Sequence, residues 1–221
     1  MHINNLKHPI FQNALQHIAE ISRLIHSYGW AEANAGNISM DVSDLVMQCM
    51  HTELKWYIVS RTGSRYRQTA LSPCENLMLV ACSQTEDTFF PQNALPTSEW
   101  ISHRCLQMQN DRFKIILHTH PAEIIALSNL TLAKDSASLN AKLCESLPEL
   151  PLYLPEGVAL VPRAAPGSLA LCTASIKALK NQKALIWSGH GILAFANELD
   201  EALDYLEIVT KAAKILLWNL K

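Results

Sequence analysis

The chain has 221 residues, which is enough for one large domain with a sizeable core. Hydrophobic residues make up 49% and charged residues 17%, a globular composition that argues against a disordered, collagen-like or coiled-coil protein. Eighteen basic and 20 acidic side chains give a formal net charge of -2, so no polybasic signal points to nucleic acid or an anionic membrane.

The N-terminal segment and the cysteines indicate a reduced, cytoplasmic protein. The first residues lack the basic-then-apolar pattern of a signal peptide, and no apolar run reaches the ~18–20 residues of a membrane span. None of the six cysteines falls in a CxxC pair, which disfavours a ribbon-type zinc site. We therefore expect most cysteines to serve as small core residues.

Hydrophobic spacing and start signals predict the elements of the first half. Apolar side chains from Ile10 to Ile25 recur at helical spacing and precede Gly29, a typical helix end. Pro96, Thr97 and Ser98 form a helix-start signal. In chain order the prediction is a helix at 9–28, strands at 38–47, 55–60 and 76–83, and a helix at 96–109.

The second half alternates short strands with helices. A buried strand at 114–121 is closed by Pro121, and Pro155 and Gly157 divide residues 150–162 into two short strand candidates. Residues 184–195 read as two strands joined by a Gly-His-Gly turn. Helices are predicted at 122–130, 136–147, 167–182 and 198–220.

Strands follow one another directly as well as alternating with helices. That order favours a mixed or antiparallel sheet over a regular parallel βαβ series. We expect a three-layer α/β fold with a central, largely antiparallel sheet and helices on both faces. Because no repeat, low-complexity tract or linker interrupts the chain, residues 1–221 are predicted to form a single domain.

Three histidines stand out as possible metal ligands. His118 and His120 are two residues apart on a predicted strand, so their side chains share one face. His190 lies between Gly189 and Gly191, which permit a sharp turn. Either motif alone also occurs at an ordinary polar strand end or surface turn. Together they supply three neutral nitrogen donors, the number that catalytic zinc sites use while one position stays open.

Polar residues elsewhere suggest a base and an anion site. Glu99 follows the helix-start signal, so it is either an ordinary first-turn carboxylate or a base beside the metal. The segments 34–39 (NAGNIS) and 62–64 (TGS) are small polar turns, which can present donors to a phosphate but are often only loops.

Taken in order, the segments NAGNIS, TGS, PTSE, HTHP and GHG resemble the class II aldolase/adducin family. The resemblance runs from about residue 10 to the C-terminal helix, nearly the whole chain. Residues 32–37, 96–99, 148–162 and 186–193 are most similar to family members that cleave L-rhamnulose 1-phosphate.

The resemblance implies roles for particular residues. It implies one zinc ion per subunit, held by His118, His120 and His190, with Glu99 as the catalytic acid/base. It also implies a ring-like homotetramer with sites at the subunit interfaces, and Glu149 as a second acid that acts from a neighbouring subunit. The residues that match the family's phosphate site are Asn34, Asn37, Thr62, Gly63 and Ser98.

The implied reaction is the reversible retro-aldol cleavage of a ketose 1-phosphate to dihydroxyacetone phosphate and L-lactaldehyde, a step of rhamnose catabolism. Zinc would act as a Lewis acid on the ketose, and Glu99 would transfer a proton. The alternatives are cleavage of fuculose 1-phosphate, a sugar-phosphate dehydratase or 4-epimerase, and a non-enzymatic scaffold with structural zinc. Glu rather than Asp at position 99 disfavours the epimerase, and an open ligand position disfavours the scaffold.

Overall fold

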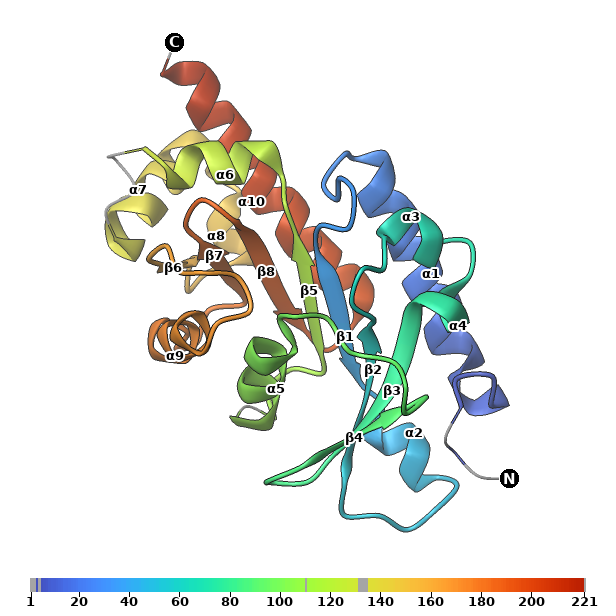
Figure 1. Ribbon diagram of the computed structural model, residues 1–221. Coiled ribbons are helices and arrows are strands. Elements are labelled where there is room, and N and C mark those ends of the chain that lie inside the picture. Colours follow the sequence, from blue (N-terminus) through green and yellow to red (C-terminus); the bar gives the residue numbers. More distant parts are fainter. Residues whose placement is uncertain (1–2, 4, 110, 131–134, 221) are drawn as a thin grey trace. The chain divides into compact units, whose positions relative to one another are not determined.

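The computed structural model describes residues 3, 5–109, 111–130 and 135–220, and Figure 1 shows it as a ribbon. The chain divides into two compact units, Met1–Trp100 and Ile101–Lys221. The prediction that residues 1–221 act as a single domain stays a prediction.

The first unit contains an antiparallel sheet with the strand order β4-β3-β2-β1. Its strands are β1 (Asn37–Asp41), β2 (Lys55–Ser60), β3 (Leu77–Cys82) and β4 (Asp87–Phe90). Its helices are η1 (Pro9–Phe11), α1 (Gln12–Ser27), α2 (Ser43–Met47), α3 (Tyr66–Thr69) and α4 (Pro73–Asn76). The predicted strands at 55–60 and 76–83 are thereby confirmed, whereas β4 has no counterpart among the predicted elements.

Helix α1 confirms the predicted N-terminal helix. Ile18, Ile21 and Ile25 are buried along one face, and α1 contacts α3 and α4. The helix ends at Ser27, and Gly29 follows with a φ of +73°, a left-handed conformation that suits glycine after a helix.

The strand predicted at 38–47 is correct only in its first part. β1 ends at Asp41, and the short helix α2 begins at Ser43. The Oδ1 atom of Asp41 accepts a hydrogen bond from the backbone N–H of Ser43 at 2.8 Å. This local bond turns the backbone out of the strand, as Asp and Asn side chains often do.

The second unit contains the strand order β5-β8-β7-β6, antiparallel except for the parallel pair β6–β7. Its strands are β5 (Ile115–Thr119), β6 (Ala159–Val161), β7 (Ala184–Trp187) and β8 (Gly191–Ala196). Its helices are α5 (Trp100–Gln109), which starts at the last residue of the first unit, α6 (Ala122–Ser128), α7 (Ser136–Ser146), α8 (Leu150–Tyr153), α9 (Leu169–Ala178) and α10 (Leu199–Asn219).

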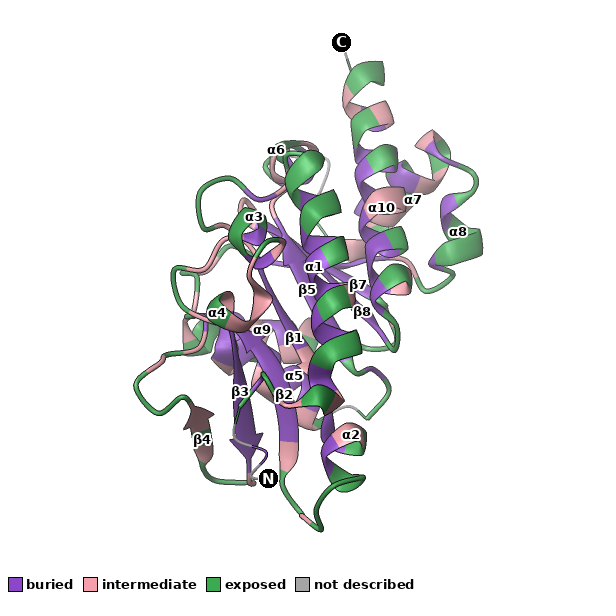
Figure 2. Ribbon diagram, turned by 90° about the vertical axis from the view of Figure 1, so that its right-hand side faces the viewer, coloured by how far each residue is buried: buried purple, intermediate pink, exposed green. Residues whose placement is uncertain are grey.

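Helices cover both faces of the strands of the second unit. On one face Ile116 and Leu193 pack in a cluster with Leu106 of α5 and Leu171 of α9. On the other face α10 runs along β5 and β8 (Figure 1). Figure 2 shows that α10 is buried along one side and exposed along the other, as an amphipathic surface helix requires. The predicted α/β class, with largely antiparallel strands and helices on both faces, is confirmed.

One strand candidate in the second unit is wrong. Residues 150–153 form the short helix α8, whereas the second candidate of that stretch is β6. Pro151 stands in the first turn of α8, where its missing N–H and fixed φ suit a helix. Leu150 is buried while Leu152 is 80% exposed, so the alternating leucines of this stretch do not share one buried face as they would in a strand.

Two further sequence expectations concern the cysteines and membranes. All six cysteines are free thiols, but only Cys82 and Cys172 are buried. The expectation that most cysteines serve as small core residues is therefore wrong, since three others are only partly buried and Cys49 is exposed. None of the helices in the described part of the chain is long and apolar enough to cross a membrane.

Candidate active site

Strand β5 supplies two of the three histidines. His118 is fully buried within the strand, and His120 follows its last residue, so both side chains leave the same face. Their ring centroids lie 4.7 Å apart, and the two Nε2 atoms are separated by 2.9 Å. Both Nε2 atoms therefore border the same small space.

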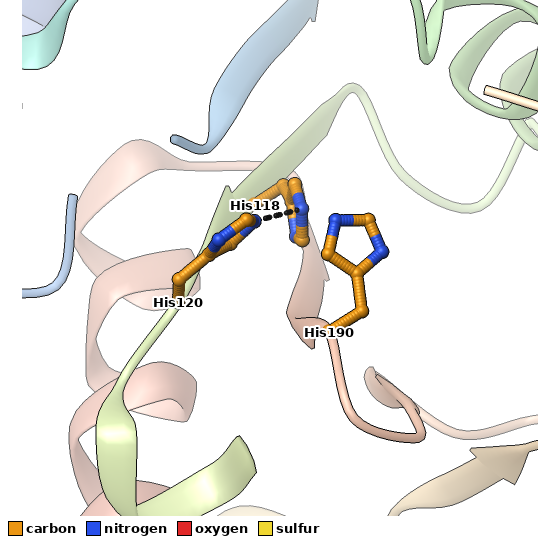
Figure 3. A group of neighbouring side chains, drawn as sticks. All are labelled: His118, His120 and His190. Atoms are coloured by element: carbon orange, nitrogen blue, oxygen red, sulfur yellow. Dashed lines mark hydrogen bonds between the residues drawn. The ribbon is translucent and has the colours of Figure 1, made fainter. Parts of the chain in front are cut away.

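The turn between β7 and β8 supplies the third histidine. β8 pairs with β5 so that Ile192 lies opposite Thr119, which brings His190 to the end of β5 where His120 stands. The His190 ring centroid lies 5.1 Å from that of His118 and 4.8 Å from that of His120. Figure 3 shows the three rings converging from the strand and the turn.

Gly191 makes this approach possible. A Cβ atom at this position would lie 2.5 Å from the Thr119 carbonyl oxygen and 2.9 Å from ring atoms of both His118 and His120. Any larger residue would therefore push the turn away from β5. The glycine after His190, noted in the sequence as a turn former, also has a packing role.

The surroundings disfavour protonation of two of the rings and orient that of His118. Nδ1 of His118 lies 2.9 Å from the carbonyl oxygen of Ile192, to which it donates a proton, leaving the Nε2 lone pair available. Burial, and next His190, lower the pKa of His118 well below its usual range. Burial and the other two rings lower the pKa of His120 to about 2. Neutral imidazoles are the form that binds metal.

The donor set fits a divalent metal ion. One ligand atom from each of His118, His120 and His190 lies within 4.8 Å of the others. These are three imidazole nitrogen donors from a strand end and an adjoining turn, a set typical of a catalytic metal site that keeps a position for substrate. The structure therefore brings the two histidine motifs together, as the sequence analysis expected.

Glu99 lies in the first unit, in a turn just before α5, and not in the first helical turn as the sequence suggested. Pro96 forms an isolated bridge with Arg61, so the segment is still extended there, and the helix begins only at Trp100. The Glu99 side chain is 4% exposed, and its Oε2 atom accepts a hydrogen bond from Nδ2 of Asn37 at 2.7 Å. The structure thus joins two residues that the sequence analysis placed in different parts of the site.

The two polar turns of the first unit adjoin the neighbouring strands β1 and β2. The backbone N–H of Thr62 donates to Leu95, and that of Thr97 donates to Ser60, so the 62–64 turn runs beside the segment that holds Ser98. Thr62, Gly63 and Ser98 are exposed, as is Asn34, whereas Asn37 is 6% exposed. These five residues all belong to the first unit.

Tyr66 is a buried neighbour that the sequence analysis missed. Its hydroxyl donates to the carbonyl oxygen of Asn37 at 2.7 Å. Burial, and next the Glu99 carboxylate, raise the pKa of Tyr66 well above its usual range, so the phenol keeps its proton. In the sequence, Tyr66 is marked only by its position four residues after Thr62. No residue pattern predicts its contact with Asn37.

Glu149 lies on the surface of the second unit, at the start of α8. Its side chain is 62% exposed, and its Oε2 atom is 3.8 Å from Nζ of Lys211. It stands outside the group formed by the three histidines. Its role as a second acid stays a prediction.

Residues 16–217 match the family model for the class II aldolase and adducin N-terminal domain. The chain belongs to this family. The match covers both units, the three histidines and Glu99. The resemblance seen in the order of the sequence motifs is therefore confirmed.

Individual relatives agree with this membership. The chain is 27% identical to a rhamnulose-1-phosphate aldolase of Bacteroides thetaiotaomicron over 94% of this chain and 86% of that one. It is also similar to the crystal structure of a sugar-phosphate aldolase from Thermotoga maritima, with 27% identity, a TM-score of 0.82, and coverage of 95% and 96% of the two chains. The L-fuculose-1-phosphate aldolase of Thermus thermophilus shares the fold, at 20% identity, a TM-score of 0.68 and coverage of 94% and 95%.

Family membership and the aldolase relatives settle the enzyme class. As a class II aldolase, this protein is an enzyme of the aldehyde-lyase type, which confirms the expectation drawn from the motifs. The alternative of a non-enzymatic scaffold is thereby disfavoured.

Proposed function

We propose that this class II aldolase is a zinc-dependent enzyme that cleaves L-rhamnulose 1-phosphate reversibly to dihydroxyacetone phosphate and L-lactaldehyde. The observation that carries the metal-dependent aldol chemistry is the convergence of three imidazoles in a chain of this family. The choice of ketose is supported by the name of the Bacteroides relative. The site would act in the cytoplasm, as a step in rhamnose catabolism.

The metal would be held by His118, His120 and His190. When bound, it supplies Lewis-acid polarisation of the ketose carbonyl and the adjacent hydroxyl. The chain's own part is to fix the three rings. The Ile192 carbonyl sets the tautomer of His118, and Gly191 lets the turn approach β5.

Glu99 would move the proton at the carbon next to the carbonyl. A base must be held in a defined orientation toward the proton that it removes. The Asn37 amide orients the Glu99 carboxylate by donating a hydrogen bond to its Oε2 atom at 2.7 Å. Tyr66 fixes the backbone of Asn37 by donating a hydrogen bond to its carbonyl oxygen. Because the carboxylate is almost fully buried, it would act in a partly dry site where its hydration does not compete with the proton transfer.

Uncharged donors would bind the substrate phosphate. The Nδ2 atom of Asn37 carries two hydrogens, and one of them already goes to Glu99, so the other is left for a phosphate oxygen. Thr62 would contribute mainly its hydroxyl group to phosphate binding, because its backbone N–H already donates to the carbonyl oxygen of Leu95. Gly63, Ser98 and Asn34 complete the set.

Two further features of the proposal come from the family resemblance. We expect a homotetramer in which Glu149 reaches the site of a neighbouring subunit as a second acid near the aldehyde end. Exposure of the Glu149 carboxylate is compatible with such a role. The direct test of the whole proposal is to assay a panel of ketose 1-phosphates for release of dihydroxyacetone phosphate. No release from any of them would refute the proposed activity, and release from the fuculose compound alone would refute the substrate.

Removal of the metal should abolish activity, and zinc should restore it. The segments 32–39, 96–99, 118–121 and 186–193 contain no lysine, so the site motifs offer no amine for a Schiff base. Treatment with borohydride in the presence of dihydroxyacetone phosphate should therefore leave the enzyme active. Inactivation by borohydride under these conditions would contradict the metal mechanism.

Asn37→Ala should weaken both phosphate binding and catalysis. A hydrogen bond to a charged group contributes about 1.5–3 kcal/mol, so we expect KM for the phosphorylated ketose to rise roughly 10- to 100-fold. kcat should fall as well, because Glu99 loses its amide partner. Zinc content should stay the same.

Thr62→Ala is the matched control for the Asn37 variant. The amide that holds Glu99 belongs to Asn37 and is untouched by this change, so loss of the Thr62 hydroxyl should raise KM with little change in kcat. Comparison with the unphosphorylated ketose isolates the contribution of the phosphate. If wild type cleaved the phosphorylated and unphosphorylated ketoses equally well, the assignment of this phosphate site would be wrong.

A further inference from the structure

The third histidine depends on a turn, whereas the other two stand on or directly after a strand. Residues 188–190 connect β7 to β8, and the position of His190 follows the conformation of this turn. Gly189 has a φ of +69°, so the turn relies on a left-handed residue. Contacts outside the hairpin must therefore hold the turn if it is to present a metal ligand accurately.

Two neighbouring elements anchor the start of this turn. The N–H and the hydroxyl of Ser188 both donate to the carbonyl oxygen of Val161 at the end of β6, at 3.0 and 2.7 Å. The N–H of Gly189 donates to the Ser128 hydroxyl at the end of α6, at 2.9 Å. The turn is thus tied to β6 and to α6.

The Arg163 side chain lies directly on this turn. A Cβ atom at Gly189 would be 2.2 Å from Nη2, 2.8 Å from Cζ and 2.9 Å from Nε of Arg163, so the guanidinium group covers the space beside Gly189. The same Nη2 atom donates to Oδ1 of Asn129 at 2.7 Å. Asn129 follows Ser128, so one end of α6 holds both the turn backbone and the arginine that covers it.

We propose that Arg163 is a positioning residue for the metal ligand His190, and that Asn129 fixes it in this role. The flat guanidinium group closes the outer side of Gly189, while the Trp187 ring stacks on the His190 ring at a centroid distance of 5.1 Å and an angle of 19°. In the described part of the chain no carboxylate pairs with Arg163, so its hydrogen bond to Asn129 serves the turn and not an ion pair. The planar shape of the Arg163 guanidinium group therefore matters more at this position than its charge.

The proposal rests on the proposed metal site and goes beyond it. Residues outside the ligand set that orient a ligand typically change metal affinity or activity by about 10- to 100-fold. Arg163→Ala should therefore weaken Zn²⁺ binding by roughly 10-fold. Arg163→Lys should weaken it nearly as much, because lysine keeps the charge but has no planar group to cover Gly189.

The test measures metal affinity of the apoprotein by competition with a chromogenic chelator, alongside the absorption spectrum of the Co²⁺ form. We expect the spectrum to change in Arg163→Ala and Asn129→Ala, because the geometry around His190 changes. The double variant should be no weaker than Arg163→Ala alone, since Asn129 acts through the arginine. Independent, additive losses would overturn the proposal.

A second surface pair provides the control. Arg112 is also exposed and donates to an asparagine, Asn181, at 2.9 Å, but it stands outside the histidine turn. Arg112→Ala should leave Zn²⁺ affinity and the Co²⁺ spectrum unchanged, and the thermal midpoint of the apoprotein should be similar in both arginine variants.

Different failures have different meanings. A raised KM with unchanged zinc affinity in Arg163→Ala would show that the arginine binds substrate, and the positioning role would be wrong. An unchanged affinity and spectrum in all variants would likewise overturn it. If the wild-type protein bound no Zn²⁺ or Co²⁺ at all, the proposed metal site itself would fail.

Discussion

His190→Ala should remove metal and activity together. His190 is one of three protein donors whose ligand atoms lie within 4.8 Å of each other, and two donors alone leave an incomplete site. We expect the loss in zinc affinity to exceed the roughly 10- to 100-fold that follows loss of a supporting contact. The fall in activity should track the fall in occupancy.

Thermal unfolding with and without zinc gives an independent measure. A ligand present at 100 times its dissociation constant stabilises the folded state by about 2.7 kcal/mol. The wild-type midpoint should therefore rise on addition of zinc, whereas that of His190→Ala should hardly move. His51→Ala, a change at an exposed histidine of the first unit, should behave as wild type. If His190→Ala kept full zinc content and full rate, the ligand assignment would be wrong.

The sequence was most informative where a pattern is local. The helical spacing in α1 and the strands β2 and β3 depend on residues within one element, and all were predicted. Residues 150–153 failed because alternating leucines resemble a strand, while their burial is decided by packing around α8. Periodicity cannot distinguish these cases in so short a segment.

The site was predicted in its parts but not in its connections. His118 and His120 share a face by strand geometry, whereas their meeting with His190 depends on the pairing of β5 with β8. The contacts proposed to orient the site link residues far apart in sequence. Tyr66 and Asn37 are 29 residues apart, and Arg163 and Asn129 are 34 apart. Such pairs leave no periodic signal, so the structure is needed to find them.

Glu99→Gln should nearly abolish proton transfer while leaving the metal in place. The substitution keeps the shape of the side chain and removes the base, and loss of general base catalysis typically costs roughly 10²–10⁴ in rate. The three histidines are untouched, so zinc content should equal that of wild type. Asn37 should still hold the side chain, because the glutamine carbonyl oxygen can accept the hydrogen bond that Glu99 Oε2 accepts at 2.7 Å.

The decisive measurement is exchange of the C–H hydrogens of dihydroxyacetone phosphate with deuterated water, in the absence of aldehyde. This half-reaction requires the base and the phosphate site but no carbon–carbon bond cleavage, so it isolates the step assigned to Glu99. Wild type should exchange one hydrogen stereospecifically, and Glu99→Gln should exchange hardly any. Tyr66→Phe is a useful companion, because it removes the hydroxyl that donates to Asn37 but keeps the base, and it should slow exchange far less. If Glu99→Gln exchanged at the wild-type rate, another group would be the base, and Glu99 would have only a structural role before α5.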